Sequence, residues 1–141
     1  MFNPSRDEAR RFFIEAWRKR KAGTPSAPME AVVADIIEAH PEYHGLYELG
    51  EDGLTKEWTP EAGETNPFLH INLHVAVREQ VSVDQPPGIR ALHMALAAKC
   101  GDLFEADHRV MDCLAEQIWQ NQRNGTPFNN ETYLDCVRRC T

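Results

Sequence analysis

The chain has 141 residues, a formal net charge of −7 at pH 7 and a hydrophobic fraction of 42%. This length fits one folded domain, and the composition excludes global disorder, so we expect a single domain over residues 1–141. The acidic charge argues against nucleic-acid binding, which needs a basic face. Without an apolar run of roughly 20 residues or a signal-peptide core, we expect a cytoplasmic protein that does not enter a membrane.

The cysteines show no metal or redox motif, because none of the four forms a C-x-x-C pair. They are Cys100, Cys113, Cys136 and Cys140. In a chain without an export signal we expect reduced, buried thiols that serve in packing.

Two helices are predicted in the first 40 residues. Ser5 and Glu8 read as a capping box for the first, whose apolar stripe of helical period ends at Gly23. The second opens at Ser26 and Pro28, and His40 falls on its apolar face. A segment from residue 45 to 65 then loses all periodicity, and we interpret it as a functional loop or lid, or as an unrecognised short hairpin.

The second half carries the clearest boundaries. A core helix begins at Asn66-Pro67, and further helices are predicted over residues 89–101, 102–124 and from residue 130, separated by glycine and proline signals. With five to six helices, no clear strand and one long loop, the predicted fold is all-α, an irregular helical bundle.

Histidines at helical spacing are the main functional signal. His70 and His74 lie four residues apart on the core helix, so their rings share one face and can meet one cation. His108 and Asp112 repeat that spacing on a later helix, in line with apolar residues. With His40, they are the predicted ligands of a divalent metal ion, zinc or iron. A plainer reading makes the histidines surface or hydrogen-bonded core groups.

Two other histidines have weaker support. His44 pairs with Glu48 at the same spacing, but Gly45 weakens the helix that the pair would need. His93 is interpreted as a satisfied interfacial residue. In chain order, these patterns resemble the haemerythrin-type di-iron bundles and the DinB-like bundles, which hold one metal with three histidines. The last spacing is one residue shorter than in haemerythrins, and His40 is not on a first helix.

Longer strings resemble one family over essentially the whole chain. They are Met1-Phe2-Asn3-Pro4-Ser5-Arg6, His40-Pro41-Glu42-Tyr43-His44, Asn66-Pro67-Phe68-Leu69-His70 with His74, Glu79-Gln80, and Asp84-Gln85-Pro86-Pro87-Gly88-Ile89-Arg90. They are similar to the bacterial domain-of-unknown-function family 1841. The resemblance implies a small bacterial cytosolic protein and assigns no substrate.

Two functions remain open. The first is a metal-binding helical protein, in which Glu79 is a candidate acid or base and an enzymatic reaction is undetermined. The alternative is a metal-free protein-interaction module that docks a partner through exposed aromatic residues, Tyr43, Tyr47 and Trp58. A homo-oligomer is compatible with either. The Asp84–Arg90 loop could flank a site, but we favour a local turn.

Overall fold

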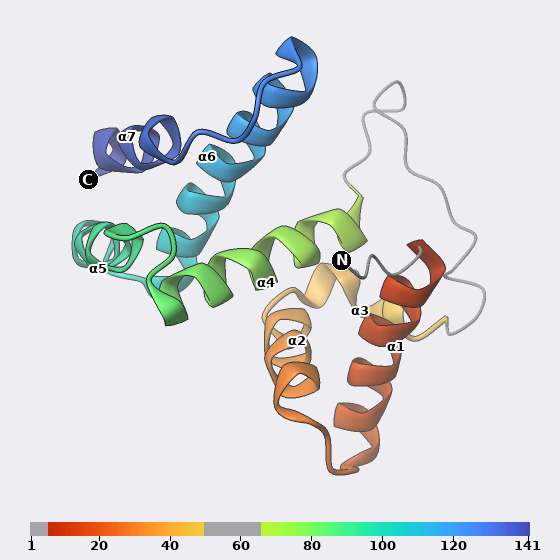
Figure 1. Cartoon of the computed structure of the whole chain (residues 1–141). Coiled ribbons are helices and arrows are strands. Elements are labelled where there is room, and N and C mark those ends of the chain that lie inside the picture. Colours follow the sequence, from red (N-terminus) through yellow and green to blue (C-terminus); the bar gives the residue numbers. More distant parts are fainter. Residues whose placement is uncertain (1–5, 50–65) are drawn as a thin grey trace. The chain divides into compact units, whose positions relative to one another are not determined.

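The protein is described here from a computed structural model, which describes residues 6–49 and 66–141. Ser5, Trp58 and most of the predicted 45–65 loop lie outside these residues. The described helices are α1 (Arg6–Ala22), α2 (Pro28–Glu38), the 3-10 helix η1 (Pro41–Tyr43), α3 (His44–Tyr47), α4 (Pro67–Val83), α5 (Ile89–Cys100), α6 (Leu103–Asn124) and α7 (Asn130–Cys140) (Figure 1).

The all-α prediction is confirmed, because the described ranges contain helices and no strand. They contain seven α-helices rather than the predicted five to six. The additional helix is α3, which has only 4 residues and therefore shows no apolar period in the sequence. None of the described helices is long and apolar enough to cross a membrane.

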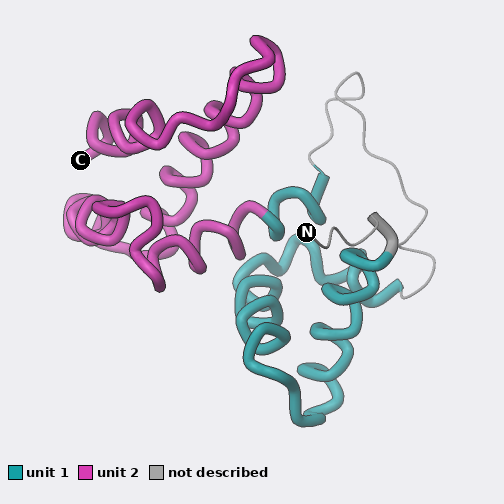
Figure 2. Tube along the Cα trace, in the orientation of Figure 1, with its two compact units in different colours: residues 1–72 teal, residues 73–141 magenta. Residues whose placement is uncertain are grey.

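Contacts divide the chain into two compact units, residues 1–72 and residues 73–141 (Figure 2). The boundary falls inside α4, so this helix contributes residues to both units. The expectation of a single domain stays a prediction.

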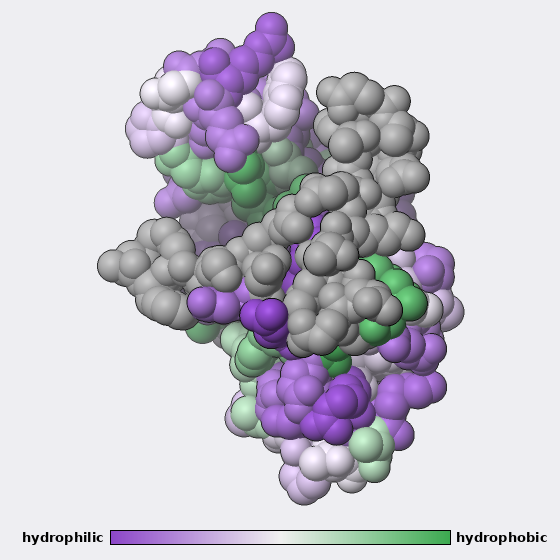
Figure 3. Space-filling model, turned by 90° about the vertical axis from the view of Figure 1, so that its right-hand side faces the viewer, coloured by the Kyte–Doolittle hydropathy of each residue, from purple (hydrophilic) through white to green (hydrophobic). Residues whose placement is uncertain are grey.

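Unit 1 is built on the packing of α1 against α2. Their apolar stripes supply most of its core, whose buried members are Phe13, Ala16, Trp17, Val33, Ala34, Ile36, Ile37, Tyr47, Phe68 and Ile71. Ion pairs also join the two helices: Lys19 to Glu30 at 2.9 Å and Arg20 to Asp35 at 2.7 Å. Hydrophilic residues cover much of the lower part of the face in Figure 3, between smaller apolar areas.

Unit 2 packs α5, α6 and α7 around a second core. This core also takes Val77 from α4; its other buried members are Ile89, Leu96, Ala106, Val110, Met111, Cys113, Leu114, Tyr133, Leu134 and Val137. Fully burying a valine, leucine, isoleucine or methionine side chain contributes about 1.5–3 kcal/mol. Trp119 of α6 is 53% exposed, and the Arg123 guanidinium lies over its ring.

The expectation of reduced thiols is wrong for Cys113 and Cys136, which form a disulfide between α6 and α7. Their Cα atoms are 5.8 Å apart, within the range that a disulfide spans. Their sequence separation is 23, and the sequence between them contains no motif that would have revealed the pair. Cys100 and Cys140 are free, as expected.

Helix ends follow the predicted signals closely. The Asn66 Oδ1 atom accepts hydrogen bonds from the amides of Phe68 and Leu69, and Asp102 Oδ1 accepts from the amide of Phe104. Such side-chain acceptors satisfy amides that have no partner within the helix. Gly125 ends α6 with a φ of +66°, a conformation that favours glycine.

The loop between α4 and α5 is a local turn, as favoured from the sequence. Asp84 Oδ1 accepts from the amides of Gly88 and Arg90. The Arg90 guanidinium in turn donates to the carbonyls of Val81 and Ser82 near the end of α4. Through these hydrogen bonds, both Asp84 and Arg90 stabilise the turn.

Candidate metal site

His40 is buried and its ring orientation is fixed by the backbone of α2. Because Pro41 disfavours helical geometry at the preceding residue, α2 ends before His40, which has φ −119° and ψ 72°. Its Nδ1 lies 2.7 Å from the carbonyl oxygen of Ile36 and must donate to it, since a carbonyl only accepts. In the neutral ring, the lone pair of His40 is therefore on Nε2.

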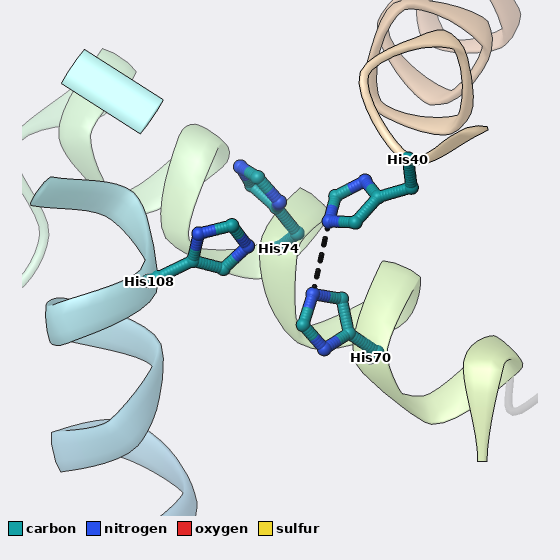
Figure 4. A group of neighbouring side chains, drawn as sticks. All are labelled: His40, His70, His74 and His108. Atoms are coloured by element: carbon teal, nitrogen blue, oxygen red, sulfur yellow. Dashed lines mark hydrogen bonds between the residues drawn. The ribbon is translucent and has the colours of Figure 1, made fainter. Parts of the chain in front are cut away.

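That nitrogen faces a second imidazole within unit 1. His40 Nε2 and His70 Nε2 are 3.0 Å apart, the bond dashed in Figure 4. With the lone pair on His40, the proton of this bond belongs to His70. The Tyr43 ring stacks on the His40 ring at a centroid distance of 5.4 Å and meets the His70 ring edge-on at 5.7 Å. Tyr43 therefore packs against both imidazoles.

His74 is the corresponding histidine of unit 2, and its side chain is fully buried. Its Nε2 lies 2.9 Å from Asp107 Oδ2. The rings of Phe104 and His108 each lie 5.2 Å from the His74 ring. These contacts fix the plane of the His74 imidazole.

Asp107 is a buried carboxylate that gathers three donors. Besides His74, His93 Nε2 lies 2.7 Å from Oδ1, and Arg78 Nε lies 2.9 Å from Oδ2. Burial acts to raise the pKa of Asp107, but the hydrogen bonds from His74, His93 and Arg78 outweigh it and hold that pKa well below its usual range. The carboxylate is therefore charged and accepts all three bonds.

The sequence interpretation missed Asp107, because it looked for a carboxylate one turn after His108. A signal was present: Asp107 lies four residues before Met111 and seven before Leu114, on the buried stripe of α6. A charged residue on such a stripe needs a buried partner. The sequence does not say which residue that partner is.

His108 is half-buried and lies close to the same cluster. Its ring meets Phe104 edge-on at a centroid distance of 4.5 Å. Burial, together with the neighbouring His74, lowers the pKa of His108, so the ring stays neutral and keeps a lone pair for a ligand. A neutral imidazole is the form that binds a metal ion.

Other predicted residues are not members of these two pairs. Asp112 and Glu79 are exposed. His44 Nε2 bonds to the carbonyl of Ile37 at 2.9 Å. His93 is a satisfied buried histidine, as expected. Tyr47, expected to be an exposed docking residue, is 1% exposed instead; its hydroxyl donates to the Pro67 carbonyl, and burial raises its pKa.

The structure thus defines an all-helical protein with a buried histidine pair in unit 1 and a histidine–carboxylate cluster in unit 2. The chain belongs to a family described as a domain of unknown function, DUF1841, whose match covers residues 5–139. The predicted family is confirmed. No curated protein and no solved structure matched this chain.

Proposed function

We propose that the protein binds one divalent metal ion, zinc or iron, through His40, His70, His74 and His108. The observation that carries this proposal is the position of His70 and His74 on α4 (Figure 4). They are four residues apart, so they lie one above the other on a single face of that helix. Each already contacts another histidine of its own unit, His40 or His108. One histidine of each pair therefore lies on α4, and these two are one helical turn apart.

The chemistry of the four side chains supports the same assignment. Among the described residues, these four histidines form a group of metal-ligand side chains that could hold an ion. An all-imidazole set suits zinc, iron, copper or nickel, and disfavours magnesium and calcium, which take oxygen ligands. The exposed Asp112 is not needed in this set.

Metal identity decides what such a site can do. Four histidines close the coordination of a tetrahedral zinc ion, which then serves folding. Iron accepts further ligands, so the same four nitrogens would leave positions for water or a small substrate. The alternative of a metal-free interaction module loses one of its expected docking residues, because Tyr47 is buried.

The test is the metal content of protein purified without a histidine tag, measured by inductively coupled plasma mass spectrometry. We expect about one ion per chain in the wild type and almost none in the His70→Ala/His74→Ala variant, which loses one ligand from each pair. His44→Ala is the matched control. It removes a half-buried histidine outside the group and should retain the ion.

Folding of each variant is checked by circular dichroism, so that loss of metal is not confused with loss of structure. A wild-type protein that contains no metal, and whose melting temperature does not change on adding zinc or ferrous iron, would overturn the proposal. Equal loss of metal in the folded His44→Ala control would also contradict it.

A further inference from the structure

We propose that Asp107 is a positioning residue of the histidine site, which holds His74 in the tautomer that presents Nδ1 to the metal ion. This inference rests on the proposed function for the ion, but its structural part concerns unit 2 alone. Asp107 is not a ligand in this arrangement. It acts through the ring of His74.

The first step is the direction of the bond between the two residues. Asp107 Oδ2 lies 2.9 Å from Arg78 Nε and 2.9 Å from His74 Nε2. The charged guanidinium of Arg78 donates to this oxygen and keeps Asp107 ionised, so the oxygen has no proton to donate to His74. The proton of the second bond must then be on His74 Nε2.

The second step concerns the other ring nitrogen. A neutral imidazole has one N–H and one lone pair, so a proton fixed on Nε2 places the lone pair on Nδ1. A metal ion binds the lone pair, and Nδ1 is consequently the ligand atom of His74. Without Asp107 the two tautomers would compete, and the fraction carrying the proton on Nδ1 could not bind.

The third step is the support that Asp107 itself receives. Its side chain is 1% exposed, and His93 holds its second oxygen at 2.7 Å. With both oxygens occupied, the carboxylate cannot rotate away from His74. A hydrogen-bonded carboxylate also makes the imidazole a stronger electron donor, which is why such partners change metal affinity about 10- to 100-fold.

His40 provides an internal comparison. Its Nδ1 donates to the Ile36 carbonyl at 2.7 Å, so the lone pair of the neutral ring is on Nε2, the nitrogen that faces His70. His40 and His74 are thus oriented in the same way, by a fixed acceptor at the nitrogen that does not bind. The acceptor is a backbone carbonyl in one case and a charged carboxylate in the other.

The experiment measures both the tautomer of His74 and the affinity of the protein for zinc. Long-range proton–nitrogen correlation spectra of metal-free protein should show His74 protonated on Nε2 and unprotonated on Nδ1. In Asp107→Asn a second population protonated on Nδ1 should appear, and zinc affinity, measured by chelator competition, should fall by about 10- to 100-fold. Glu116→Gln is the matched control; it removes one negative charge from an exposed position of α6 and should leave affinity and tautomer unchanged.

Each outcome decides the inference. A His74 ring protonated on Nδ1 in the wild type overturns it, as does a folded Asp107→Asn variant with unchanged tautomer and affinity. If the wild type binds no metal, the proposed function fails, while the spectra still show whether Asp107 fixes the His74 tautomer. Should Asp107→Asn fail to fold, the wild-type spectrum alone decides.

Discussion

At the scale of single residues, the partner of a histidine decides its chemistry, and that partner is often remote in sequence. The spacing of His70 and His74 predicted which helix face they share. It could not predict that Asp107, which is 33 residues beyond His74, accepts a bond from it. The bond that His40 donates to the Ile36 carbonyl is local, but it depends on where α2 ends. The residue types and their spacing therefore pointed to a candidate site. The tautomer of each histidine could be assigned only from its partners in the fold.

Asn66 is a residue whose role was predictable, because a cap is a local interaction. Replacing it by alanine removes the acceptor for the amides of Phe68 and Leu69 at the start of α4. We expect Asn66→Ala to lower the free energy of unfolding by about 1 kcal/mol, measured by urea denaturation. Asn66→Ser keeps a capping oxygen and should recover most of the loss. An equal loss in Asn72→Ala, an exposed asparagine of the same helix, would contradict this explanation.

At the scale of elements, the sequence predicted the long helices. It did not predict the shortest helix or a bond between residues far apart in the sequence. Boundaries at Gly23, Asn66 and Gly125 were predicted because caps and left-handed glycines act within a few residues. Helix α3 was missed because 4 residues show no period. The Cys113–Cys136 disulfide was missed because it joins two helices whose pairing only the fold reveals.

Helix α2 also provides a pH-dependent contribution to stability. Glu30 accepts a hydrogen bond from the Ala27 amide at 2.8 Å and pairs with Lys19, and these two partners lower its pKa from the usual value of 4.5. A lowered folded-state pKa stabilises the protein above the unfolded pKa, and the contribution disappears as pH falls through the folded value.

We therefore expect Glu30→Gln to be less stable than the wild type in urea at pH 7, and the difference to shrink toward zero as the pH falls below the lowered pKa of Glu30, where both side chains are neutral. Glu38→Gln removes the same charge from an exposed position at the other end of α2 and controls for net charge. A Glu30→Gln deficit that persists unchanged in acid would assign the effect to packing rather than to ionisation.

At the scale of the whole molecule, fold class followed from helical periodicity, whereas the division at residues 72 and 73 did not. No proline, glycine or polar linker marks this boundary, because it lies inside α4. The consequence for the proposed site is specific. Two of the proposed ligands, His40 and His70, belong to unit 1, and the other two, His74 and His108, belong to unit 2.

One ion bound by all four histidines would therefore stabilise both units together, and hydrogen exchange can detect this. Zinc at about 100 times its dissociation constant should slow exchange that requires loss of the ion by about 100-fold. We expect slower exchange at the end of α2, next to His40, and in the first turns of α6, next to His108, with smaller changes in α7. The His40→Ala variant should lose the protection at both places, because removing one ligand weakens the shared ion. Protection that persists around His108 in this variant would show that each unit binds metal independently, and a single shared ion would then be wrong.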